Sequence, residues 1–184
     1  KTLSEKKKNI SIALSGGSTP LPILCILKEY KLNWEYFNFF MVDERNVSIS
    51  SSLSNYGNIK KVFFKDIKSP SYSMINNNYS IEECANNYEK LLLSKIPLGK
   101  NNLPFFDLIL LGIGDDGHTA SLFPGTSGLN ESKKAVVKNR VPQLNTERIT
   151  LTYPVILNAA KIIILVKGAI KDEILKEIKM GVGD

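Results

Sequence analysis

The stretch NISIALSGGSTP at residues 9–20 passes from a strand pattern through a glycine turn into the start of a helix. Residues 9–14 are rich in isoleucine and other apolar side chains, and Gly16 and Gly17 permit a tight turn. Pro20 is favoured in the first turn of a helix, and apolar residues continue at helical spacing to about Tyr30. This order of elements predicts the first unit of a parallel sheet.

The rest of the chain repeats the alternation of strands and helices. Because strands alternate with helices, we predict an α/β, Rossmann-like fold, with a mostly parallel sheet covered by helices on both faces. Two polar stretches without periodicity, residues 48–54 and 125–141, are predicted to be surface loops. Further strands are expected at 37–42, 105–111, 148–152 and 161–167, and further helices at 55–64, 80–96, 154–160 and 169–180.

Length and composition indicate one globular domain over residues 1–184. The chain is 43% hydrophobic and 23% charged, which excludes a disordered or fibrous protein. No apolar run approaches the roughly 20 residues of a membrane-spanning helix. We therefore expect no membrane partner and a cytoplasmic location.

The net charge of +6 does not indicate a nucleic-acid partner. Arg45, Arg140 and Arg148 are the only arginines among 24 basic residues, and the lysines are scattered along the chain. Proteins that bind nucleic acids usually cluster their basic residues and use arginine to read bases. Two distant cysteines, Cys25 and Cys84, and a single histidine provide no zinc cluster, so we expect neither a metal nor a cofactor.

Polar or glycine-rich segments follow four of the predicted strands: Ser15–Thr19, Asp43–Arg45, Gly112–His118, and Gly168 with Lys171. Ligands of open α/β sheets bind outside the carboxyl ends of the strands. The sequence therefore predicts that these segments meet in one site.

A phosphate group is the ligand that several of these segments suit. Gly16 and Gly17 let backbone N–H groups approach a ligand, Ser18 and Thr19 add hydroxyls, and the following helix directs its positive end there. Arg45 could form a forked contact to phosphate, and Lys171 could reach it from the first turn of the last helix. The alternatives are a turn capped by Ser18 or Thr19, a solvated charge cluster at Asp43–Arg45, and a solvated Lys171.

His118 is the only histidine, and it follows the most apolar predicted strand through a glycine-rich turn. An imidazole can take a proton from water near neutral pH, and Asp116, two residues earlier, could orient it. Ser121 does not lie in a GxSxG motif, which disfavours a covalent serine mechanism. The pattern favours water, activated by His118, as the nucleophile.

Five motifs together resemble the glucosamine-6-phosphate isomerase/6-phosphogluconolactonase family, on its lactonase side. They occur in family order: ALSGGSTP at 13–20, DER at 43–45, SNY at 54–56, GIGDDGHTASLFP at 112–124 and RITLT at 148–152. The resemblance implies a fold like those of glucosamine-6-phosphate deaminase and ribose-5-phosphate isomerase. It also implies metal-free hydrolysis of 6-phosphogluconolactone in the oxidative pentose phosphate pathway.

Carried over by position, the resemblance makes His118 the general base and Asp116 its acidic neighbour. It assigns Ser15, Gly16, Gly17, Ser18, Thr19, Arg45 and Lys171 to phosphate binding.

The chain also departs from the family pattern. Lys167 stands where the family tends to have threonine, and Arg140 is not followed directly by the proline that usually follows the family's basic residue at this place. The family's leading helix and closing segment are not found, so we expect a domain shortened at both ends. Fusion to glucose-6-phosphate dehydrogenase, which occurs in some organisms, is consistent with such a domain.

Two rival functions remain open at this point. A glucosamine-6-phosphate deaminase tends to carry tyrosine at the position of Arg45 and a GHxAFNEP-like run, where this chain has Thr119–Phe123. A non-catalytic sugar-phosphate sensor would keep the phosphate loops without needing His118 and Asp116.

Overall fold

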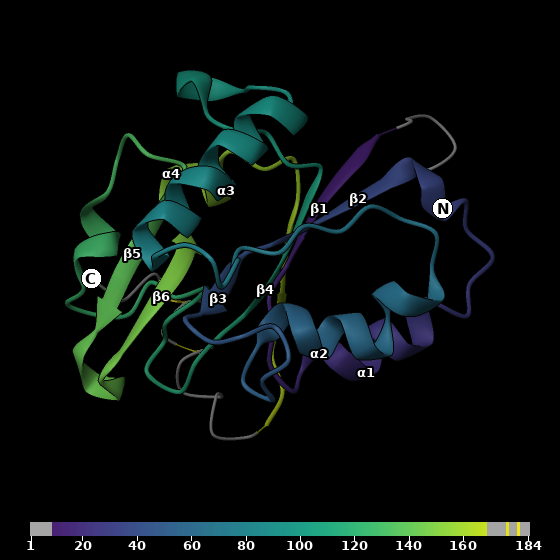
Figure 1. The fold of residues 1–184 in the computed structure, drawn as a ribbon, viewed down its shortest axis with the longest axis horizontal. Coiled ribbons are helices and arrows are strands. Elements are labelled where there is room, and N and C mark those ends of the chain that lie inside the picture. Colours follow the sequence, from purple (N-terminus) through teal and green to yellow (C-terminus); the bar gives the residue numbers. More distant parts are fainter. Residues whose placement is uncertain (1–8, 169–175, 177–179, 181–184) are drawn as a thin grey trace.

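The computed structural model describes residues 9–168, Lys176 and Met180 (Figure 1). Four parallel strands form its main sheet in the order β2-β1-β4-β7. Ile12 at the centre pairs with Phe39 of β2 on one side and Leu108 of β4 on the other. These central strands are apolar and largely buried, as expected for a sheet covered on both faces. The strands are β1 (Ile10–Leu14), β2 (Phe37–Met41), β4 (Leu108–Gly112) and β7 (Ile162–Leu165).

Helices lie on both sides of this sheet, which confirms the predicted fold class. In Figure 1, α1 and α2 lie together on one side, and α3 and α4 on the other. The predicted capping box at the start of α3 is present: Ser80 Oγ accepts from Glu83 N, and Ser80 N donates to Glu83 Oε2. The helices are α1 (Pro20–Leu27), α2 (Asn55–Val62), α3 (Ile81–Lys95) and α4 (Tyr153–Leu157), and short 3-10 turns occur at Trp34–Tyr36, Phe64–Asp66, Lys100–Asn102, Ser127–Asn130 and Pro142–Leu144.

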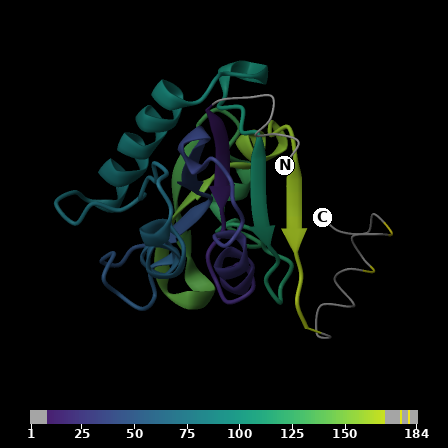
Figure 2. The ribbon, with the colours of Figure 1, turned by 90° about the vertical axis from the view of Figure 1, so that its right-hand side faces the viewer.

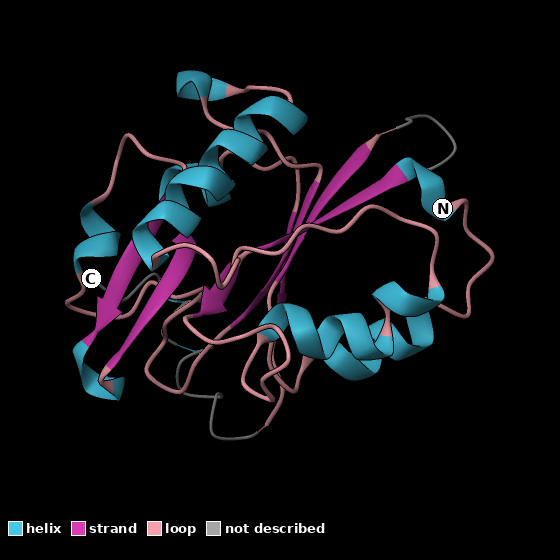
Figure 3. Cartoon of the chain, in the orientation of Figure 1, coloured by secondary structure: helices cyan, strands magenta, loops and turns pink. Residues whose placement is uncertain are grey.

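A second, antiparallel sheet stands beside the first, and its strands run in the order β3-β6-β5 (Figure 3). Its strands are β3 (Asp43–Arg45), β5 (Val136–Val141) and β6 (Thr146–Leu151). Val42 joins the two sheets, because its N–H donates to Leu14 O and its carbonyl accepts from Leu151 N. The strand predicted at 148–152 therefore belongs to this sheet, and Asp43–Arg45 is a strand rather than a loop.

The prediction that residues 125–141 form a surface loop is wrong, because Val136–Val141 is strand β5. Asn139 is fully buried on this strand, while Lys138 and Arg140 are exposed. A polar residue at an inward position removes the alternation of apolar and polar residues by which a strand is recognised. Tertiary hydrogen bonds make that inward position suitable for asparagine.

The helix predicted at 169–180 lies outside the described residues, apart from Lys176 and Met180. In Figure 2 the described chain leaves β7 at the edge of the parallel sheet. Among the helices that the structure describes, none has both the length and the apolar character needed to cross a bilayer.

Candidate active site

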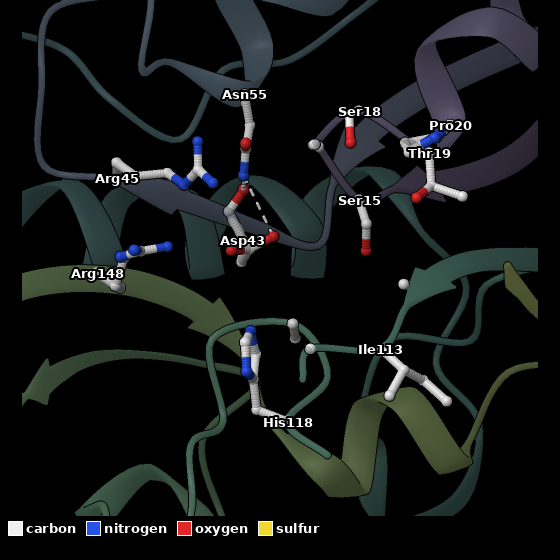
Figure 4. Close-up of a pocket in the computed structure, with 15 residues that line it drawn as sticks. Ser15, Ser18, Thr19, Pro20, Asp43, Arg45, Asn55, Ile113, His118 and Arg148 are labelled. Carbon is white, nitrogen blue, oxygen red and sulfur yellow. Dashed lines mark hydrogen bonds between the residues drawn. The ribbon is translucent and has the colours of Figure 1, made fainter. Parts of the chain in front are cut away.

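A pocket opens at the carboxyl ends of the parallel strands, where the two sheets meet (Figure 4). The segments that follow β1, β2 and β4 all contribute to it, together with the start of α2 and one residue of β6. This is the place at which open α/β sheets bind ligands. The residues that line the pocket are Ser15, Gly16, Gly17, Ser18, Thr19, Pro20, Asp43, Arg45, Asn55, Gly112, Ile113, Gly114, His118, Ala120 and Arg148.

The glycine loop between β1 and α1 forms one wall. Gly17 has a φ of +94°, a conformation that glycine adopts without strain. A Cβ atom on Gly16 would lie 1.9 Å from Asn55 Oδ1, so only glycine lets the loop approach α2 this closely. Thr19 is the N-cap residue of α1, but its side chain makes no capping hydrogen bond. The alternative that the Thr19 hydroxyl only caps this helix is therefore wrong.

The loop also presents unpaired polar groups to the pocket. Ser15 Oγ is buried without a hydrogen-bond partner among the described residues. The first turn of α1 begins at Pro20 on the same wall, and of Pro20, Leu21 and Pro22 only Leu21 carries a backbone N–H, which has no intrahelical acceptor. Donors of this kind suit an anionic oxygen.

The three residues of the Asp43–Arg45 segment have different roles, so the alternative of a solvated charge cluster is wrong. Asp43 is 6% exposed and Glu44 is fully buried. Asp43 Oδ2 accepts from Ser121 Oγ at 2.7 Å, and its backbone carbonyl accepts from Asn55 Nδ2 at 3.0 Å. Asp43 of β3 is thus hydrogen-bonded both to α2 and to the loop after β4.

Glu44 holds the start of α2. Its Oε1 accepts from the backbone N–H groups of Arg45 and Asn55, and its Oε2 accepts from Tyr56 N and Ser54 Oγ, at distances of 2.7–3.0 Å. Burial raises the pKa of the Glu44 carboxyl, and the three backbone hydrogen bonds partly oppose this. Glu44 is therefore a structural carboxylate that positions Arg45 and Asn55.

Replacing Glu44 with glutamine is expected to lower the unfolding free energy by about 1–3 kcal/mol at pH 7, because the amide NH₂ would face a backbone donor. Burial raises the pKa of Glu44 above its ordinary value of 4.5, so the folded chain retains a proton that the unfolded chain has lost. Stability therefore falls as pH rises through this interval, and the variant should lack that fall. Urea unfolding at several pH values measures both effects.

Glu29→Gln is the matched control, because Glu29 is exposed. Its effect should stay within about 0.5 kcal/mol. A Glu44→Gln variant as stable as wild type would contradict the structural role.

Arg45 and Arg148 lie side by side on the antiparallel sheet, because they are direct register partners on the neighbouring strands β3 and β6. Arg45 Nη1 donates to Leu53 O at 2.7 Å, whereas Nε of each arginine is buried without a partner among the described residues. Burial lowers the pKa of Arg148, and the positive charge of Arg45 lowers it further, while Asp43 and Glu44 oppose this. Two half-buried guanidinium groups therefore lie at one wall of the pocket, with the carboxyl groups of Asp43 and Glu44 near them.

His118 lies across the pocket from Ser18 and Thr19, and its imidazole contacts Asp116 (Figure 4). His118 Nδ1 lies 2.5 Å from Asp116 Oδ1, and His118 N donates to the same oxygen at 3.2 Å. Partial burial raises the pKa of Asp116, but the hydrogen bonds and charge of His118 outweigh it, so the net direction is down. Because a carboxylate holds Nδ1, Nε2 is the nitrogen left for proton transfer.

Two neighbours hold the imidazole ring in place. The ring stacks on Phe123 with the centroids 3.7 Å apart and the planes 21° from parallel. A Cβ atom on Gly114 would lie 2.1 Å from Nδ1 and Cε1 of His118, so this glycine leaves the space that the ring occupies. Position 114 of the glycine-rich turn therefore requires glycine, because any side chain there would collide with the imidazole.

Most of the predicted site residues meet in this pocket. Asp116 does not line it but contacts His118, and Lys171 lies outside the described residues. Arg140 and Lys167 are exposed and do not line the pocket; Arg140 Nη2 donates to Asn145 Oδ1. Within residues 9–168, no group of three or more His, Cys, Asp or Glu side chains could hold a metal ion.

Sequence reasoning gave no role to Asp43, Asn55 or Arg148, although all three line the pocket. The available signals were the scarcity of arginine and the presence of all three residues in the family motifs. Which strand would stand beside β3 was not apparent, so Arg148 could not be placed opposite Arg45.

Comparisons with known proteins find a matching family model and similar sequences. The family model described as glucosamine-6-phosphate isomerases/6-phosphogluconolactonase matches residues 1–183. A 6-phosphogluconolactonase of Chlamydia pneumoniae is 39% identical over 91% of this chain and 64% of its own length. The 6-phosphogluconolactonase-like protein 1 of Saccharomyces cerevisiae is 38% identical over 97% of this chain and 59% of its own length. The chain thus spans less than two thirds of these two relatives.

A solved structure shows the same fold. The crystal structure of 6-phosphogluconolactonase from Thermotoga maritima superposes with a TM-score of 0.87 at 31% identity, covering 98% of this chain and 80% of that one.

Proposed function

Because the chain belongs to the glucosamine-6-phosphate isomerase/6-phosphogluconolactonase family, we propose that it hydrolyses 6-phospho-D-glucono-1,5-lactone to 6-phosphogluconate, a step of the oxidative pentose phosphate pathway. The observation that carries this proposal is one pocket with a carboxylate-held imidazole at one end and a glycine loop with unpaired polar groups at the other. Such a pocket suits a substrate that carries both a phosphate and a hydrolysable bond.

The substrate phosphate binds at the glycine loop. Backbone N–H groups at Gly16, Gly17 and Leu21 donate to its oxygens, and the hydroxyls of Ser15, Ser18 and Thr19 add further donors. Arg45 contributes positive charge from β3. Lys171, which the family resemblance assigns to the phosphate, completes this set.

His118 then acts as the general base. Its Nε2 takes a proton from a water molecule as the water oxygen bonds to the lactone carbonyl carbon. Asp116 holds Nδ1–H and stabilises the imidazolium that forms. When the tetrahedral intermediate collapses, the bond from the carbonyl carbon to the ring oxygen breaks. His118 returns its proton to that oxygen, and the product is an open-chain acid with a new hydroxyl.

The proposal is tested by the rate at which the purified protein releases acid from freshly prepared 6-phosphogluconolactone. We expect acid release well above the spontaneous rate and no ammonia from glucosamine 6-phosphate. Ammonia release without lactone hydrolysis would assign the chain to the deaminase side of the family. Binding of 6-phosphogluconate without any turnover would favour the sensor. A cytoplasmic location and fusion to glucose-6-phosphate dehydrogenase stay predictions.

A further inference from the structure

We propose that Arg148 is a catalytic residue, which donates to the carbonyl oxygen of the lactone and stabilises the negative charge that develops there. This inference rests on the proposed hydrolysis and adds the group that receives the oxyanion. In acyl transfer, donors aimed at the developing oxyanion usually contribute one of the largest single effects.

The position of Arg148 relative to His118 supports this role. The guanidinium carbon of Arg148 lies 5.8 Å from the centroid of the Phe123 ring, on which the His118 imidazole stacks at 3.7 Å. One buried aromatic ring therefore supports both the base and the cation. In Figure 4, Arg148 and His118 lie near each other, whereas Ser18 and Thr19 lie on the far side of the pocket.

The order of groups along the substrate matches the order of these residues in the pocket. Its phosphorus is separated from the carbonyl carbon by the phosphoester oxygen, C6, C5 and the ring oxygen. When the phosphate lies in the glycine loop, the carbonyl carbon must lie beside His118, because that residue delivers the water. In the proposed arrangement the carbonyl oxygen points toward Arg148, the cation that shares the Phe123 ring with His118.

The two arginines differ in what their donors already bind. Arg45 commits Nη1 to Leu53 O, whereas none of the described residues accepts a hydrogen bond from the guanidinium of Arg148. Burial and the charge of Arg45 lower the pKa of Arg148, which marks a partly desolvated cation. Desolvation strengthens the interaction of a cation with charge that appears only in the transition state.

The step balances without any further reactant. Water adds through oxygen to the carbonyl carbon, the carbonyl π electrons move to the oxygen beside Arg148, and His118 holds the proton. As the carbonyl re-forms, the electrons of the bond to the ring oxygen leave with that oxygen, which takes the proton from His118. Arg148 exchanges no proton.

The experiment compares Arg148→Ala with Arg45→Ala in two measurements. These are kcat for 6-phosphogluconolactone and the inhibition constant of inorganic phosphate. We expect Arg148→Ala to lower kcat by about 10²–10³-fold, as the loss of an oxyanion donor does, with the phosphate inhibition constant changed by less than about threefold. Arg45→Ala should raise that constant by about tenfold or more, because it removes a charged hydrogen bond to the phosphate, and should lower kcat much less than Arg148→Ala does.

Two further measurements separate this role from a structural one. Guanidinium or methylguanidinium ion added to Arg148→Ala should restore part of the turnover, and added to Arg45→Ala it should not raise kcat. Arg148→Lys keeps the charge and should retain part of kcat. It provides the test if Arg148→Ala disturbs the fold. A rise in KM and in the phosphate constant with unchanged kcat would make Arg148 a phosphate ligand and overturn the proposal. Absence of lactone hydrolysis in wild type would instead defeat the proposed function.

Discussion

Replacing His118 with alanine is expected to lower kcat for 6-phosphogluconolactone by about 10²–10⁴-fold, the usual contribution of a general base. The affinity for 6-phosphogluconate should stay within a few-fold of wild type, because the glycine loop and Arg45 do not depend on the imidazole. Acid release, corrected for spontaneous hydrolysis, measures the first quantity, and calorimetric titration measures the second.

Asp116→Asn is the companion variant, because it removes the carboxylate that lies 2.5 Å from His118 Nδ1 and leaves the imidazole in place. We expect a smaller fall in kcat than for His118→Ala. Equal turnover in wild type and His118→Ala would remove His118 from the mechanism. A loss of product binding equal to the loss of kcat would indicate that the pocket itself has collapsed.

Replacing Gly114 with alanine is expected to lower kcat nearly as much as removing the imidazole. The new Cβ would lie 2.1 Å from Nδ1 and Cε1 of His118 and 2.8 Å from Asp116 Oδ1, so the ring must move off its stacked position. The backbone can stay as it is, because Gly114 does not have a positive φ and the His118 side chain is 24% exposed, which lets the ring rotate. The thermal midpoint should therefore change little while the steady-state rate falls.

The control is a double-mutant cycle with His118→Ala. When the imidazole is absent, Gly114→Ala has no ring to displace and should cost no additional activity, so the two changes should be strongly non-additive. Additive losses of kcat would show that Gly114 acts on something other than His118. A large drop in the thermal midpoint of Gly114→Ala would point to a backbone effect instead.

Much of the fold could be predicted from local patterns. The apolar strands around Ile12 and Ile109, the glycine turn at Gly16 and the capping box of Ser80 each depend on residues close together in the chain. Parallel strands place their carboxyl ends at one edge, so the approximate position of the pocket also followed. The antiparallel sheet could not be predicted from local patterns, because strand β5 carries a buried polar residue in place of an apolar one.

Asn139 shows why that strand needed tertiary information. Its Nδ2 donates to Ser121 O and Thr126 Oγ1, and its Oδ1 accepts from Gly128 N. The partners of its side chain thus lie in the segment that also contains Phe123. A buried amide is favourable only where such partners exist, and no local pattern indicates them.

By itself, the amino-acid sequence determined the α/β class, the glycine loop, and the pairing of Asp116 with His118, because each depends on neighbours within a few residues. Only the tertiary structure placed Arg148 opposite Arg45 and Phe123 beneath His118. Arg45 and Arg148 lie about a hundred residues apart in the chain. The register between their strands results from packing across the whole domain, and a shift of one residue would turn either side chain away from the pocket.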